Sequence, residues 1–132
     1  MRALVFLLLL TLPACADDKR EIDFTQRLVG LTGEELKQCV KPDHKDPAKC
    51  AELGPITLGD AALYALLSDD ERGLDPRKKW ERERLARKVW KNAHAVLSPA
   101  DAALIQDRIG RVYPATTIGA AWPLLDPTLA EK

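Results

Sequence analysis

The sequence predicts a mainly α-helical protein in which a short N-terminal β-hairpin is followed by a small bundle of three to four helices. Three helix-start signals support this fold class, namely Thr57 before an apolar run, Asp75-Pro76 and Ser98-Pro99. A side-chain oxygen at such a position accepts a hydrogen bond from a free N–H of the first turn. Proline suits the first helical position because its fixed φ already matches the helix.

Residues 21–40 predict the N-terminal hairpin. The segment 21–29, EIDFTQRLV, is rich in strand formers and places apolar side chains at alternate positions, which is typical of a short strand. The segment 30–33, GLTG, predicts a turn, and residues 34–40 predict either the returning strand or one helical turn. Residues 41–56 are polar and contain three prolines, so they predict a loop.

The first predicted helix covers residues 57–67, with Thr57 or Asp60 as its cap. An acidic break follows, and a long helix is predicted from Asp75 to about His94. Its buried stripe repeats every four residues, through Leu85, Val89 and Ala93.

The next predicted helix begins at Ser98, and Leu104, Ile105 and Ile109 form its buried stripe. A last segment begins at Pro114 and places apolar side chains at helical spacing. We expect Pro123 and Pro127 to limit its length, because proline cannot continue the helical hydrogen bonds.

The first sixteen residues, MRALVFLLLLTLPACA, have the order of a secretory signal peptide. An arginine precedes an apolar run, and small residues end it. The run is shorter than the roughly 20 residues that a membrane-spanning helix requires. The sequence therefore predicts a leader over residues 1–16 and a single small domain over residues 17–132.

The end of the leader allows two processing routes. The segment 12–15, LPAC, resembles a bacterial lipobox, with proline where a small or branched residue is usual, and the resemblance implies lipidation of Cys15. Because Ala16 follows, resemblance to bacterial lipoproteins favours the outer membrane where the cell has one. The alternative is cleavage after Ala16, which discards Cys15 and releases a soluble periplasmic or secreted protein. A third alternative leaves the leader unprocessed.

Charge balance limits the classes of partner. The chain has 20 Lys and Arg against 20 Asp and Glu. A balanced chain has no overall attraction to nucleic acid or to an anionic membrane. We therefore expect no nucleic-acid partner, and contact with a membrane through the lipid anchor.

Cys39 and Cys50 lie eleven residues apart, and export favours a disulfide between them. The alternatives are two free thiols or a metal site that adds His44, Asp43 and Asp46 as ligands. The spacing matches no short C-x-x-C pattern, so we expect a disulfide and no metal.

The long helix is strongly basic between residues 77 and 91. Most of its basic positions lie outside the Leu85–Val89–Ala93 stripe, which favours a solvated face. The alternative is a docking surface for protein or lipid, and nucleic acid fits poorly with export. Trp80 and Trp90 are interleaved with the candidate docking residues Arg77, Lys78, Arg82, Arg84, Arg87, Lys88 and Lys91.

Catalytic patterns do not emerge from the sequence. There is no G-x-S-x-G, H-E-x-x-H or P-loop motif. His94 is expected at the end of the long helix, where the helix dipole favours a charged imidazole. Ser98 is already explained as a cap, and no acidic residues form a recognisable acid/base pair. We therefore expect no enzyme activity, no catalytic residue and no cofactor.

A series of short segments in order along the chain carries a resemblance: 22–26, 57–60, 65–67, 85–88, 103–105, 109–110, 119–122 and 124–125. Through these segments the chain resembles, from Ile22 onward, small phage and prophage proteins of undefined function. The resemblance implies a small helical protein and transfers no catalytic residue. Those proteins lack a leader, so the leader and the 39–50 segment depart from the pattern.

These observations together predict a non-enzymatic, exported and lipid-anchored envelope protein that binds an envelope or phage protein. The resemblance implies a prophage origin. The protein would face the periplasm or the cell surface. The alternative is an intracellular phage accessory or assembly factor that uses the basic helix 77–91 to dock protein or nucleic acid.

Overall fold

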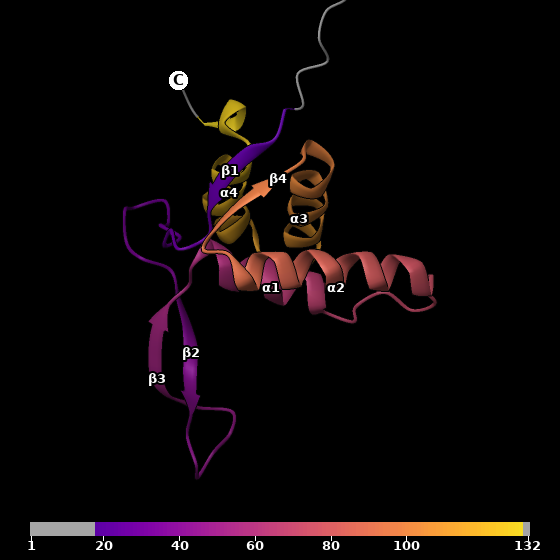
Figure 1. Ribbon diagram of the computed structural model, residues 1–132. Helices are drawn as coiled ribbons and strands as arrows, with labels where there is room; N and C mark the ends of the chain where they lie inside the picture. Colours follow the sequence, from indigo (N-terminus) through magenta and orange to yellow (C-terminus); the bar gives the residue numbers. More distant parts are fainter. Residues whose placement is uncertain (1–17, 131–132) are drawn as a thin grey trace, which may run out of the picture.

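The computed structural model describes residues 18–130 and shows a mixed α/β protein (Figure 1). Its four helices are accompanied by two antiparallel sheets of two strands each, β1–β4 and β2–β3. The predicted helical bundle after an N-terminal hairpin is therefore wrong. The described elements are β1 (Arg20–Asp23), β2 (Lys37–Pro42), β3 (Cys50–Pro55), α1 (Leu58–Leu67), α2 (Pro76–Lys91), β4 (His94–Leu97), α3 (Pro99–Val112), α4 (Ala115–Leu125) and the 3-10 turn η1 (Pro127–Leu129).

The first strand is shorter than predicted and has a distant partner. β1 ends at Asp23, whose carboxylate accepts hydrogen bonds from the backbone and the hydroxyl of Thr25 and so forms a turn. β1 pairs with β4, from Arg20 opposite Leu97 to Asp23 opposite His94. Residues 34–40 are therefore not the returning strand of β1.

The long helix ends earlier than predicted. α2 stops at Lys91, and the side-chain amide of Asn92 donates to the carbonyl of Lys88 at 3.0 Å. Beyond it, β4 alternates exposed and buried residues, with Ala95 and Leu97 inside. Ala93 fits the helical stripe by spacing alone, but it is exposed and its carbonyl accepts from the N–H of Phe24.

The predicted loop over residues 41–56 is also wrong, because β3 lies within it and pairs with β2. Nearly every residue of both strands is at least partly exposed. A strand with no buried face needs no alternation of apolar and polar residues, and that alternation is the usual sequence signal for a strand. The hairpin therefore has the composition of a loop.

The helix starts are confirmed at all three predicted positions. Thr57 caps α1, and Asp60 completes the capping box by accepting from the backbone of Thr57. Asp75 caps α2 and Ser98 caps α3. α4 continues through Pro123 and ends two residues later, so the predicted limit at that proline is wrong.

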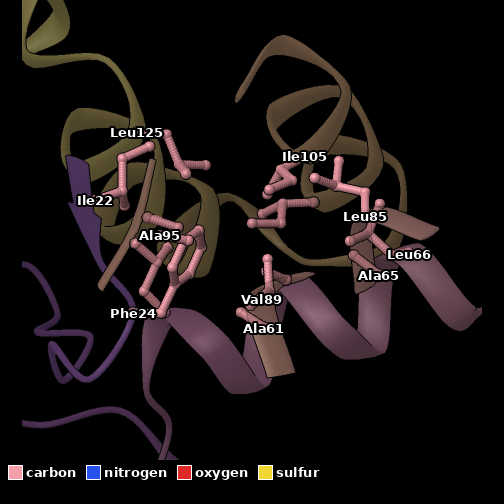
Figure 2. Packing of buried hydrophobic residues seen from close by; sticks show 14 of the residues in the cluster. Ile22, Phe24, Ala61, Ala65, Leu66, Leu85, Val89, Ala95, Ile105 and Leu125 are labelled. Carbon is pink, nitrogen blue, oxygen red and sulfur yellow. The ribbon is translucent and has the colours of Figure 1, made fainter. Parts of the chain in front are cut away.

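The core lies where the helices meet the β1–β4 pair. Figure 2 shows Ile22, Phe24, Ala95 and Leu125 grouped beside that pair. The helical part of the core is rich in alanine, including the fully buried residues 61, 62 and 65 of α1. Small side chains let α1 lie close to both α2 and α3.

One charged side chain is completely enclosed. Arg108 of α3 has a side-chain exposure of 0%. Its Nε donates to the carbonyl of Ala65 at 3.1 Å, and its terminal nitrogens donate to the carbonyl of Ser68, to Asp70 and to Glu71. The guanidinium thus satisfies carbonyls at the end of α1, a helix with no basic residue in its last turn.

One of the same carboxylates also pairs with an arginine of α2. Glu71 Oε1 lies 3.2 Å from a terminal nitrogen of Arg82 and 3.0 Å from Arg108 Nη1. Arg82 is buried between α2 and the acidic turn, with 11% of its side chain exposed. We call Arg82, Arg108, Asp70 and Glu71 the arginine cluster. It links α1, α2 and α3 through one turn.

Replacing the buried arginine should destabilise the whole fold. We expect Arg108→Gln to lower the free energy of unfolding by about 3 kcal/mol, because the α1 carbonyls and both carboxylates lose their donor. The control Arg87→Gln, at an exposed arginine of α2 outside the cluster, should leave urea unfolding almost unchanged. Equal midpoints for the two variants would show that the cluster is not needed.

Acid should weaken the same cluster. The hydrogen bond from Arg108 holds the pKa of Asp70 below its usual value of 3.8. The unfolded chain therefore takes up this proton at higher pH than the folded chain, so this part of the stability is present above the usual pKa and is lost as pH falls toward the lowered pKa. Urea midpoints at about pH 6 and pH 3 should fall more for the wild type than for Asp70→Asn. A larger fall in the variant would contradict this assignment.

Candidate functional site

The β2–β3 hairpin, residues 37–55, extends away from the helices as an arm (Figure 1). Its base is fixed to the body. The N–H of Leu36 donates to the carbonyl of Leu28 at 2.9 Å, and the N–H of Ile56 donates to the carbonyl of Leu36 at 3.0 Å. Gln38 Nε2 also donates to the capping carboxylate of Asp60 at 3.1 Å. The start of α1 and the arm therefore share an anchor.

The predicted disulfide joins the two strands of the arm and is confirmed. The Cys39 and Cys50 sulfurs are 2.09 Å apart, and their Cα atoms are 5.6 Å apart. Both residues are exposed. The alternatives of free thiols and of a metal site fail, because each sulfur is bonded to the other. Among residues 18–130, no group of three or more His, Cys, Asp and Glu is placed to hold a metal ion.

Each face of the arm presents an apolar side chain to solvent. Leu53 lies opposite Cys39 in the register and is 60% exposed. Val40 is 52% exposed and lies over Gly54, where a Cβ atom would come within 2.8 Å of Val40 Cγ1. Neighbouring residues of a strand point to opposite faces, so Leu53 and Gly54 face opposite sides of the arm. Because Val40 lies over Gly54, Val40 and Leu53 are on different faces. Sequence reasoning missed both residues because it treated this segment as a loop.

The strands of the arm are irregular. The register shifts between Cys39 and Lys41 and again between Lys41 and Pro42. Bulges of this kind twist a strand edge and interrupt its regular row of hydrogen-bonding groups. The outer edges of the arm are therefore poor templates for an added strand.

The arm, residues 37–55, carries four lysines and three acidic residues, so its net charge is close to zero. The carboxylates of Asp43 and Asp46 accept hydrogen bonds from the backbone N–H groups of Lys45 and Ala48, at 2.9 and 3.1 Å. These acidic groups thus stabilise turns of the tip itself. Four lysines, 37, 41, 45 and 49, are exposed along the arm. A partner would meet apolar side chains among both ammonium and carboxylate groups.

The predicted docking residues of the basic helix do not form one surface. Arg82 is buried in the arginine cluster, which corrects its assignment to a docking face. Among the described residues, Lys78, Lys88 and Lys91 have no ion-pair partner. The remaining arginines pair with carboxylates: Arg77 with Glu81 at 3.7 Å, Arg84 with Asp101 at 3.5 Å and Arg87 with Glu83 at 2.6 Å.

The remaining candidates for chemistry have structural surroundings. His94 lies in β4 rather than at a helix end, and its Nδ1 is 3.8 Å from a carboxylate oxygen of Glu21. Ser98 Oγ accepts the capping hydrogen bond from Asp101. Burial raises the pKa of Tyr113 to about 12, so this phenol stays protonated at neutral pH. Cys15, the predicted lipidation site, lies outside the described residues.

No protein-family model, curated protein or solved structure matches this chain. The resemblance to small phage proteins therefore stays a prediction. Between residues 18 and 130, none of the helices is both long and apolar enough to cross a bilayer.

Loss of the Cys39–Cys50 disulfide should let the strands of the arm open more often and leave the helical body folded. We expect the double variant Cys39→Ser/Cys50→Ser to speed amide hydrogen exchange in β2 and β3 by about 100-fold, because closing a loop of this length stabilises by about 3 kcal/mol. Amides buried in α1 and α3 should exchange nearly as before. An equal acceleration in the body would show that the arm and the core unfold together.

Proposed function

We propose that this protein is a small, exported, lipid-anchored and non-enzymatic envelope protein that binds another protein through its arm. The observation that carries the proposal is a disulfide-stapled hairpin that extends from the body with an apolar side chain exposed on each face. The arm offers a partner one apolar contact on each face, and the disulfide and the hydrogen bonds at its base hold these contacts in place.

Export is supported by two independent features. The order of the leader is that of a secretory signal peptide, and the Cys39–Cys50 disulfide is exposed to solvent. Exposed disulfides of this kind persist in oxidising compartments and are rare in the cytosol.

The position of the arm suits an anchored protein. Figure 1 shows the chain entering the body near β1, at the end of the molecule opposite the tip of the arm. A lipid on Cys15, three residues before the first described residue, would hold that end near the membrane. The arm would then extend away from the bilayer, where a partner can reach it.

The side chains of the arm define the chemistry of the partner. Leu53 and Val40 require an apolar cleft, and the lysines and acidic residues around them require a rim with charges of both signs. Because bulges interrupt the strand edges, we do not expect the partner to add a strand. The arm would instead insert into the cleft and present both faces.

One groove of the body lacks the groups that catalysis requires, whereas four other hollows are lined in part by charged side chains. The groove of about 480 Å³ between residues 29–31 and α4 is lined by apolar and small residues, among them Leu31, Ile118 and Trp122. It has no titratable side chain in its lining. Acid–base or nucleophilic catalysis requires such groups in a pocket.

Site-specific photo-crosslinking in cells that express the protein tests whether the arm binds a partner. A photoreactive residue at Ala51 should give one discrete adduct with an envelope protein, and Leu53→Ser should reduce it at least fivefold, since an interface anchor of this size contributes about 1 kcal/mol or more. Leu67→Ser is the matched control, because Leu67 of α1 is 58% exposed and lies off the arm.

The outcomes distinguish binding by the arm from non-specific binding by any exposed apolar side chain. Loss of the adduct in the Leu53→Ser chain and its retention in the Leu67→Ser chain would support the proposal. Absence of any adduct at Ala51, or equal loss in both variants, would overturn binding through the arm.

A further inference from the structure

Positive charge is concentrated on one helix of a chain that is neutral overall. α2 carries eight Lys and Arg but only two Glu in its 16 residues. The remainder of the chain has twelve basic and eighteen acidic residues and is therefore negative. This segregation gives α2 a charge preference that the whole-chain balance hides.

The outward face of α2 combines this charge with tryptophan. Trp80, Arg84, Arg87 and Lys91 follow one another at helical spacing and fall within about 60° of arc, on the side opposite Val89. Figure 1 shows α2 along one side of the molecule. We call this row, with Arg77, Lys88 and Trp90 beside it, the α2 face.

The aromatic side chains of this face are not part of the core. Trp80 is 60% exposed and Trp90 is 77% exposed. By contrast, Trp122 is half-buried and donates its indole N–H to the carbonyl of Gln106 at 3.1 Å. Packing in the core therefore does not account for the two exposed indoles of this basic helix.

The charges of the face remain available to an anion. Lys88 and Lys91 have no ion-pair partner among residues 18–130. The Arg77–Glu81 pair is 3.7 Å long and exposed, and so is the shorter Arg87–Glu83 pair at 2.6 Å. Arg84 lies 3.5 Å from the half-buried Asp101. Exposed surface pairs contribute little to stability, so a competing anion can replace their carboxylates.

We propose that the α2 face docks on an anionic lipid surface. Lysine and arginine near such a surface are attracted to its phosphates, and tryptophan prefers the headgroup level where its ring is apolar and its N–H is wet. The two exposed tryptophans favour lipid over a nucleic-acid backbone, which calls for charge alone. The interaction needs no lipid on Cys15 and is independent of the arm.

Vesicle co-sedimentation tests the proposal. The full chain carrying Cys15→Ala, expressed with its leader, is mixed with vesicles of phosphatidylcholine alone or with about 30% phosphatidylglycerol. We expect at least tenfold tighter binding to the anionic vesicles and a loss of about tenfold or more for Lys88→Gln/Lys91→Gln. The matched control Lys41→Gln/Lys45→Gln removes two exposed lysines from the arm and should change binding by less than about twofold.

The fluorescence of tryptophan adds a second readout. Anionic vesicles should shift the emission to shorter wavelength, and Trp80→Phe should reduce the shift. Equal binding to both kinds of vesicle, or equal losses in the two lysine pairs, would overturn the proposal. Salt-sensitive binding to duplex DNA without a preference between vesicles would assign the face to nucleic acid. None of these results changes with Leu53→Ser, so failure here is distinct from failure of the arm.

Discussion

The fold depends on a buried guanidinium. Arg108 of α3 donates to carbonyls at the end of α1 and contacts the carboxylates of the acidic turn. One of these carboxylates, Glu71, also pairs with Arg82 of α2. Burying an arginine is costly unless every donor finds a partner. No buried side-chain polar atom among the described residues lacks one. This requirement fixes how three helices meet around a small, alanine-rich core.

The base of the arm is held in place by the start of α1. The capping box of α1 and the base of the arm share Asp60, which accepts from the backbone of Thr57 and from Gln38. The arm is thus held where α1 begins, while its disulfide limits its own freedom. Binding loses less entropy when the contact residues are already ordered. The same body presents α2 on a different surface, so two contacts with different chemistry can coexist.

Local chemistry predicted the elements better than their pairing. Thr57, Asp75 and Ser98 mark helix starts because capping depends on neighbouring residues alone. β1 and β4 are separated by most of the chain, and no local pattern joins them. For the site, cysteine spacing and the leader predicted the disulfide, whereas Leu53 and Val40 were missed because the exposed strands lack alternation. Arg108 was missed because a lone arginine in a helix has the pattern of a surface residue.

The central claim is that a stapled arm acts outside the cytoplasm on an anchored body. The most direct test is the intact mass of the protein recovered from fractionated cells that express it with its own leader. We expect a chain that begins at Cys15, carries acyl groups, has Cys39 and Cys50 oxidised, and is found in membranes. A full-length, reduced chain in the cytoplasm would contradict this claim.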